Sequence, residues 1–322
     1  MLKEIPITAL DVRIGNAENK EAGTGCTVII RESGMCAGLD VRGGGPASRE
    51  SELLKPVAAA QSIHAVLLSG GSAFGLDAAG GVQQYLEERG VGFDVGVTKV
   101  PLVCQSCLFD LTVARADVRP DRAMGYAACQ NAEAGNYRDG SFGAGTGATV
   151  GKLCGMERCM KSGIGSYAVQ CGELMVGAIV AVNALGDVFD WKDGKKAAGL
   201  LNEERTGFAS SEEQLYSSIE VVENKFVNNT TIGAVITNAA FDKTSLCKIA
   251  AMAQNGLARA IRPVHTTADG DSLYALSTGG VAADLDVVGT LAAQVVSEAI
   301  LRAVKSAETA YGYPSYQELV KD

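Results

Sequence analysis

The stretch NNTTIGAVITNAA, residues 228–240, holds two asparagines and two threonines directly before a small apolar run. Polar turn-forming residues ahead of an apolar segment indicate a turn that leads into a β-strand, with the threonines at its mouth. The preceding stretch, residues 192–229, is polar, contains NEERTG, SSEEQ and ENKFVNN, and shows little periodicity. We therefore expect an exposed connector that ends at Asn229 and a core strand that begins near Thr230.

The rest of the chain alternates irregularly between strand-like and helix-like segments. Apolar residues at helical spacing predict helices over residues 49–62, 244–260 and 286–306. Short apolar runs predict strands over residues 175–182, 232–237 and 272–277. Strands and helices in one chain of 322 residues, 47% of them hydrophobic, predict an α+β fold with a large core or two modest ones.

Composition restricts the class of partner. The net charge of −9 argues against a nucleic-acid partner, because such proteins present a basic face. No segment approaches the roughly 20 uninterrupted apolar residues of a membrane helix, and the first 23 residues are too polar for a signal peptide. Nine scattered cysteines are typical of reduced thiols, so we expect a cytoplasmic protein without membrane contact.

Metal and cofactor sites are not indicated. The only histidines, His64 and His265, do not stand at ligand spacing to the Cys104–Cys107 pair, so we expect small core cysteines and no metal. A lone histidine such as His265 is usually structural. The glycine-rich loops also fail as nucleotide motifs, since Lys152 is followed by Leu153 where a phosphate-binding loop needs Ser or Thr. We expect no cofactor.

The junction at Asn229 and Thr230 offers chemistry that needs no histidine. If the chain is cut before Thr230, the new α-amino group has a pKa of about 8 and can take the proton of the same residue's hydroxyl. The cut itself can proceed when the Thr230 hydroxyl attacks the Asn229 carbonyl, the acyl group shifts from nitrogen to oxygen, and water opens the ester. This reaction needs a bent peptide and donors for the developing oxyanion.

Five segments, taken in order, resemble one family of enzymes. They are GGGPASRESELLKP (43–56), LLSGGSAFGLDAAGGV (67–82), GAGTGATVGK (143–152), NTTIGAVITN (229–238) and TTADGDSLYALSTG (266–279). Together they resemble the self-processing family that includes L-aminopeptidase/D-esterase, the β-peptidyl aminopeptidases and the nylon-oligomer hydrolase. The NTT junction is most similar to the nylon-oligomer hydrolase branch, because the aminopeptidase branch usually begins its small fragment with Ser.

The resemblance implies a fold and an activity. The fold is a four-layer αββα sandwich, similar in layering to N-terminal-nucleophile hydrolases but with different connectivity. Residues 1–322 then form a single domain that is self-cleaved into 1–229 and 230–322, and the processed heterodimers assemble into a homo-oligomer. The expected activity is hydrolysis of amide bonds in small peptides, amino-acid amides or ω-amino-acid oligomers.

The resemblance also assigns roles to individual residues. Thr230 takes the position of the nucleophile, and Lys152 that of a lysine beside it. Asn183, in VAVNALGD, matches an amide suited to an oxyanion hole. Asp269 and Asp271 match paired acids that orient the new amine or the hydroxyl.

The substrate-binding residues are less closely matched. Phe109 belongs to VPLVCQSCLFDL (100–111), a segment that approaches the pocket in the resembled family but is more apolar there. Glu133 and Asp139 lie upstream of GAGTG, where the aminopeptidase branch holds a substrate amine with an acid.

Two alternatives to hydrolysis stay open at this point. Ornithine acetyltransferases also self-cleave before Thr and resemble this layering, but pass an acetyl group to an amine. A non-catalytic small-molecule binder would instead use the glycine-rich loops as a nest for phosphate. The GGSAFGLDAA and RESELL segments favour the peptidase alternative.

Overall fold

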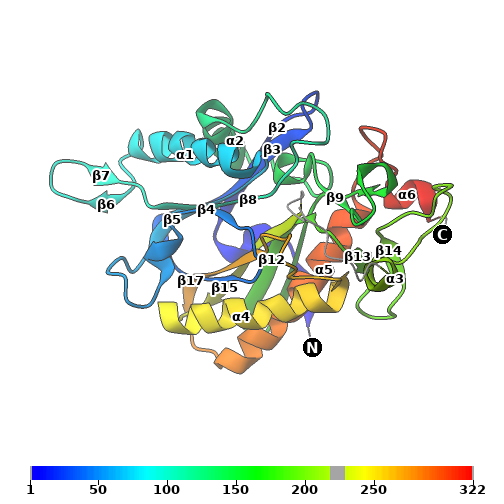
Figure 1. Ribbon diagram of the computed structural model, residues 1–322. Helices are drawn as coiled ribbons and strands as arrows, with labels where there is room; N and C mark the ends of the chain where they lie inside the picture. Colours follow the sequence, from blue (N-terminus) through cyan, green and yellow to red (C-terminus); the bar gives the residue numbers. More distant parts are fainter. Residues whose placement is uncertain (1, 218–228, 321–322) are drawn as a thin grey trace.

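The computed structural model describes residues 2–217 and 229–320, and Figure 1 shows the elements along the chain. The strands are β1 (Lys3–Ile5), β2 (Arg13–Asn19), β3 (Thr24–Val41), β4 (Ala47–Arg49), β5 (Ile63–Ser69), β6 (Phe93–Asp94), β7 (Lys99–Val100), β8 (Val103–Cys107), β9 (Thr149–Val150), β10 (Met160–Lys161), β11 (Ile164–Cys171), β12 (Leu174–Asn183), β13 (Asp187–Phe189), β14 (Lys196–Ala198), β15 (Thr230–Ala239), β16 (Ile261–Arg262) and β17 (Ser272–Val281). The α-helices are α1 (Ala78–Glu87), α2 (Arg122–Glu133), α3 (Ser211–Ser217), α4 (Lys243–Ala260), α5 (Leu285–Lys305) and α6 (Tyr316–Leu319). Short 3-10 turns are η1 (Ile7–Leu10), η2 (Ser51–Leu54), η3 (Ser72–Asp77), η4 (Gly143–Gly145) and η5 (Met156–Arg158).

The long strand β3 is shared by two sheets. Its first half pairs antiparallel with β2 and β5, and its register shifts between Ile30 and Met35. Its second half, residues 36–41, pairs antiparallel with β17. One sheet therefore has the order β2-β3-β5-β8-β4 and the other the order β1-β11-β12-β15-β17-β3.

The central strands are buried on both faces. In β12, Val180 and Val182 pack toward the helices α4 and α5, while Ile179 and Ala181 pack toward the other sheet. This division follows from the two-residue period of a β-strand, which sends successive side chains to opposite faces. Such strands need an apolar residue at almost every position, and for that reason they read as continuous apolar runs in the sequence.

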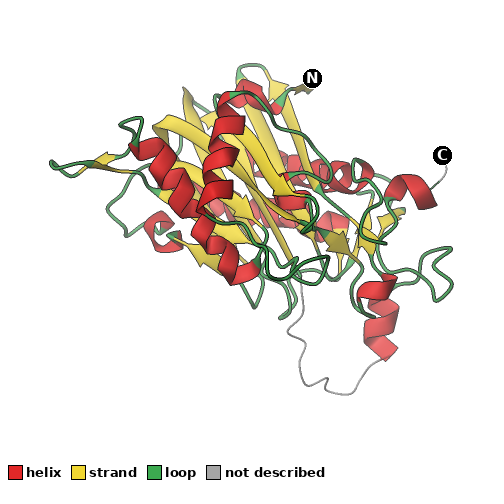
Figure 2. Ribbon diagram, turned by 90° about the horizontal axis from the view of Figure 1, so that it is seen from above, coloured by secondary structure: helices red, strands yellow, loops and turns green. Residues whose placement is uncertain are grey.

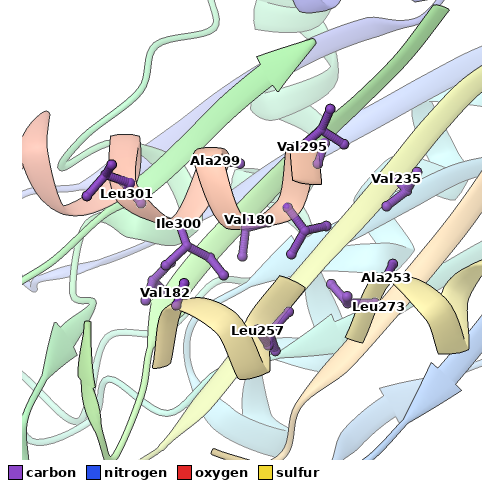
Figure 3. Close-up of a cluster of buried hydrophobic side chains, with 14 of the residues drawn as sticks. Val180, Val182, Val235, Ala253, Leu257, Leu273, Val295, Ala299, Ile300 and Leu301 are labelled. Carbon is purple, nitrogen blue, oxygen red and sulfur yellow. The ribbon is translucent and has the colours of Figure 1, made fainter. Parts of the chain in front are cut away.

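Three hydrophobic clusters fill the spaces between four layers. One lies between α1, α2 and the first sheet, one between the two sheets, and one between the second sheet and α4, α5. Figures 1 and 2 show these helix pairs on opposite faces of the stacked sheets, and Figure 3 shows part of the third cluster around Val182, Leu257 and Ile300. The predicted four-layer αββα sandwich is confirmed.

Helix α5 is the most apolar of the described helices. By length and composition it would suffice to cross a membrane, the only described helix that does, yet 67% of its most apolar window is buried inside this fold. It packs against α4 and against strands β11 and β12. Here it is the core helix of a layered protein, and its apolar residues serve the third cluster.

Two expectations from the sequence are wrong. Residues 49–62 hold the end of β4 and the single turn η2 rather than a helix. Glu50 has a positive φ of 59°, and the ammonium of Lys243 binds the carbonyl oxygens of Leu53 and Ala58. The left-handed backbone at Glu50, the two carbonyl groups bound by Lys243 and the missing N–H of Pro56 prevent the continuous hydrogen bonding of an α-helix.

The second error concerns the connector. Within it, Ala198, Leu200 and Leu201 are buried, although the sequence predicts an exposed segment. The reason is Asp187, whose buried carboxylate accepts hydrogen bonds from Lys196 Nζ at 2.6 Å and from the Leu200 amide at 2.7 Å. Residues 218–228 of the expected connector lie outside the described residues.

Candidate active site

Sheet topology brings three chain segments together at one edge. Strand β12 ends at Asn183 and β15 begins at Thr230, and because the two strands are antiparallel these residues face each other in register. Strands β15 and β17 run parallel, so the start of β17 lies at the same edge. The loop that carries Asp269 and Asp271 leads directly into β17 and therefore reaches the mouth of β15.

Thr230 is buried, with 4% of its surface exposed. Its hydroxyl donates a hydrogen bond to the carbonyl oxygen of Asn229, so the hydroxyl lies against the carbonyl group of the preceding peptide bond. Gly270 forms the opposite wall, where an added Cβ would lie 2.7 Å from Thr230 Oγ1. Only glycine at this position leaves room for the hydroxyl.

Asn183 is held in one orientation by its neighbours. Lys152 Nζ donates to Asn183 Oδ1 at 2.8 Å and to its backbone carbonyl at 3.0 Å, and the Thr149 amide donates to Oδ1 at 3.1 Å. Asn183 Nδ2 donates to the Phe109 carbonyl at 2.9 Å. Since an ammonium has no acceptor, the lysine identifies the oxygen of this amide and leaves Nδ2 as the donating end.

Lys152 follows β9 and is almost completely buried. Burial lowers the pKa of its ammonium to about 7, although the nearby carboxylates of Asp269, Asp110 and Asp271 act in the opposite direction. A lysine with such a pKa is partly neutral at physiological pH. In that form it is able to accept a proton from a hydroxyl group.

The two acids differ in their partners. Asp269 Oδ2 accepts hydrogen bonds from the amide and the hydroxyl of Thr266, at 2.9 and 2.6 Å. Burial, and then the charge of Asp271, raise the pKa of Asp269 to about 6. Asp271 Oδ1 accepts a hydrogen bond from the Thr231 amide at 2.7 Å, so this acid binds the peptide bond that follows Thr230.

His265 belongs to the same cluster, although the sequence suggests only a structural role for it. Its Nδ1 lies 2.9 Å from Asp271 Oδ2, and its backbone amide donates to the same oxygen at 3.2 Å. The signal that points to it is its place at the start of HTTADGD, six residues before Asp271. Sequence spacing alone does not show that the loop folds back to make this contact.

A third buried acid, Asp110, lies next to Phe109. It accepts hydrogen bonds from the Thr24 hydroxyl at 2.7 Å and from the Gly71 amide at 2.8 Å. Burial raises the pKa of its carboxyl to about 6. Asp110 thereby fixes the segment whose Phe109 carbonyl holds the Asn183 amide, and Phe109 reaches the cluster through its backbone.

The structure does not bring Glu133 and Asp139 to this cluster. Glu133 lies at the end of α2 in an outer layer, where it binds Tyr85 and Arg89 with 53% of its side chain exposed. Asp139 accepts a hydrogen bond at 2.9 Å from Ser166, which lines a cleft of about 520 Å³ along β1 and β11. Their roles in substrate binding stay predictions without support from the geometry.

The Cys104–Cys107 pair, which is expected to be structural, lies in the core. Cys104 and Cys107 are buried on β8, which confirms them as small core residues. Within residues 2–217 and 229–320, no three His, Cys, Asp or Glu side chains form a group that could hold a metal ion.

The chain is similar to known proteins over most of its length. Residues 7–317 match peptidase family S58. An uncharacterized aminopeptidase of Mycobacterium leprae is 40% identical over 314 residues, which is 91% of this chain and 85% of the relative. A 6-aminohexanoate-oligomer endohydrolase of Kocuria sp. is 29% identical over 91% of this chain and 84% of its own length.

Solved structures share the fold. The L-aminopeptidase D-Ala-esterase/amidase of Ochrobactrum anthropi, described as a new variant among the Ntn hydrolase fold, superposes with a TM-score of 0.69 and 16% identity, covering 96% of this chain and 90% of the other. A β-aminopeptidase of Burkholderia sp. gives 0.66 at 19% identity, with 98% and 92% covered. The predicted likeness to N-terminal-nucleophile hydrolases is confirmed at the level of the fold.

Proposed function

Because this chain belongs to peptidase family S58, an aminopeptidase and amidase family of hydrolases, we propose that it cleaves its own Asn229–Thr230 bond and then hydrolyses amides with Thr230 as nucleophile. The observation that carries the proposal is the contact between the Thr230 hydroxyl and the Asn229 carbonyl. Asn183 faces Thr230 across the sheet, Lys152 binds Asn183, and Asp271 binds the amide that follows Thr230. The proposal favours hydrolysis over acetyl transfer to an amine, because the matched family is a peptidase family.

In the proposed cut, neutral Lys152 takes the proton of the Thr230 hydroxyl while the oxygen attacks the Asn229 carbonyl carbon. Asn183 Nδ2 donates to the developing oxyanion, in the orientation that Lys152 and Thr149 impose. The C–N bond then breaks, the amine of Thr230 leaves with a proton, and an ester links Asn229 to the threonine oxygen. Water hydrolyses this ester and releases the carboxylate of Asn229 and the free Thr230.

Substrate hydrolysis would repeat these steps with an external amide. The free amine of Thr230 acts as the base for its own hydroxyl, and the acyl group of the substrate is carried on the threonine oxygen until water removes it. Asp271, bound to the Thr231 amide, keeps the first residues of β15 in place during both half-reactions. The Thr230 oxygen is thus the nucleophile for two amide bonds, the Asn229–Thr230 bond of the precursor and the substrate amide in the processed enzyme.

The names of the relatives support a proposal for the substrate class. Some are named aminopeptidases and another is named an oligomer endohydrolase of 6-aminohexanoate. We infer that this chain acts on small peptides, amino-acid amides or ω-amino-acid oligomers. The Ochrobactrum enzyme is described as a prototype of serine aminopeptidases, whereas this chain offers Thr230 at the proposed cut, and a secondary alcohol can serve in the same role.

Intact mass spectrometry of the purified protein tests the proposal. Wild-type protein should give fragments 1–229 and 230–322, the smaller with the N-terminal sequence TTIGAV. Thr230→Ala should remain one chain and lack amidase activity, while Thr231→Ala serves as the neighbouring control that still processes. An active wild-type enzyme that stays uncut would refute the mechanism.

The substrate is tested with processed enzyme. The panel contains L- and D-amino-acid amides, a β-amino-acid amide and linear 6-aminohexanoate oligomers, and kcat/KM ranks them. We further propose that processed heterodimers assemble into a homo-oligomer. Light scattering coupled to size exclusion measures the mass of the assembly, and a mass equal to one chain would exclude it.

A further inference from the structure

We propose that His265 is a positioning residue that acts through Asp271 on Thr230. This inference rests on the proposed function, because its effect is measured on the cut and on the turnover that Thr230 performs. The starting observation is that the two oxygens of the Asp271 carboxylate bind two different groups. Asp271 Oδ2 is bound by His265 Nδ1 at 2.9 Å, and Asp271 Oδ1 is bound by the Thr231 amide at 2.7 Å.

The hydrogen bond from His265 restricts the orientation of Asp271, and through it the position of the Thr231 amide. A carboxylate held by donors on both oxygens has little freedom to rotate, and the side chain of Asp271 is only 2% exposed. The Thr231 amide belongs to a planar peptide group, so holding its N–H also fixes the carbonyl and the Cα of Thr230. That Cα bears the nitrogen that becomes the free amine of the processed enzyme, and its Cβ bears the hydroxyl.

The tautomer of His265 follows from the same geometry. An ionised carboxylate oxygen only accepts hydrogen bonds, so Nδ1 must carry a proton. His265 does not itself contact Thr230 in any described hydrogen bond, which is why its role is positioning rather than catalytic. Its backbone amide also binds Asp271 Oδ2, at 3.2 Å, and this contact survives any substitution other than proline.

The backbone at His265 permits a matched pair of variants. Its φ is +57°, a left-handed conformation that glycine and asparagine adopt most readily. His265→Gly keeps this conformation and removes the side-chain donor. His265→Asn keeps the conformation and offers an amide N–H near the place of Nδ1, so the difference between the two variants reports the hydrogen bond rather than the backbone.

The experiment measures processing of freshly translated full-length chains and the kcat and KM of those that mature. We expect His265→Gly to slow processing and lower kcat by about 10- to 100-fold with little change in KM, because a hydrogen bond to a charged group is lost. His265→Asn should recover most of this loss. In an Asp271→Asn background, His265→Gly should add less than about a twofold further effect, because the two residues act as one unit.

A His265→Gly chain that processes as fast as wild type overturns the inference and leaves the proposed function intact. Equal loss in the Gly and Asn variants does the same. Full additivity of His265→Gly with Asp271→Asn also contradicts action through Asp271. A wild-type chain that is never cut at Asn229 is a different result, since it refutes the proposed function and this inference together.

Discussion

Lys152 donates one hydrogen bond to the backbone carbonyl of Asn183 and a second to its side-chain oxygen, at 3.0 and 2.8 Å. The ammonium therefore sits at the end of β12 and orients the amide there at the same time. Asn183 faces Thr230 in register. A substitution of Lys152 therefore removes the proposed base and also releases the Asn183 amide, the proposed donor to the oxyanion.

Replacing the lysine should slow processing. Lys152→Met keeps an unbranched side chain but removes the amine, and we expect the cut to slow by about 10²- to 10⁴-fold, the usual contribution of a general base. The time course of the 1–229 fragment in a translation reaction measures it. Processing at the wild-type rate would show that Lys152 is not the base.

The pH dependence of the cut should report the same amine. Burial holds the pKa of Lys152 at about 7, and only the neutral form accepts a proton. The rate constant for processing should therefore rise with pH and level off above about pH 7. A rate that falls over pH 6 to 8 would contradict a neutral lysine as base.

Replacing the amide should affect turnover more than binding. Asn183→Asp retains the shape and an acceptor for Lys152 but lacks the N–H, and we expect kcat to fall by about 10²- to 10³-fold, as for other lost oxyanion donors. KM should stay within a few-fold, because the oxyanion forms only during reaction. A variant that raises KM while keeping kcat would assign Asn183 to substrate binding instead.

The wall opposite the hydroxyl offers a steric test. Gly270→Ala puts a Cβ 2.7 Å from Thr230 Oγ1, so the hydroxyl must move and processing should drop at least about 10-fold. Gly280→Ala is the matched control in the same part of the chain, because its added Cβ meets nothing within 4 Å. Equal processing of the two variants would show that the hydroxyl is not confined there.

The sequence predicts the second sheet and its helices well, for a physical reason. Strand β15 and helices α4 and α5 bury apolar residues with a regular period, so local pattern and tertiary environment agree. Helix α2 is not predicted, because it packs on α1 through small residues rather than an apolar stripe. A Cβ on Gly125 would lie 2.0 Å from the Ala78 carbonyl oxygen. The spacing of apolar residues in the sequence does not show that two helix backbones lie this close together.

The site is predicted only in part. The ordered motifs point to Thr230, Lys152 and Asn183. Their side chains form hydrogen bonds, Thr230 with the Asn229 carbonyl and Lys152 with the Asn183 amide. Phe109 is expected to bind substrate, yet its backbone carbonyl makes the contact with Asn183, and every residue has such a group. His265 is passed over because its bond to Asp271 depends on how a loop folds, which neither spacing nor polarity determines.

The pH dependence of stability gives a further prediction. Burial and the charge of Asp271 raise the pKa of Asp269 from 3.8 to about 6, so the folded chain holds this proton more tightly than the unfolded chain. Asp269 therefore contributes stability below about pH 4 that is lost as the pH rises through 6. Asp269→Asn removes this dependence. Relative to its parent, the variant should gain melting temperature between pH 4 and 6.5.

This comparison is made in Thr230→Ala protein, so that every sample is one uncut chain. Asp110, whose pKa is also raised to about 6, titrates in both proteins and cancels in the difference. Below pH 4 the amide and the protonated acid are nearly equivalent, and the two melting temperatures should converge. If the parent instead gains stability relative to Asp269→Asn as the pH rises, the fold favours the carboxylate, which contradicts a pKa raised by burial and by the charge of Asp271.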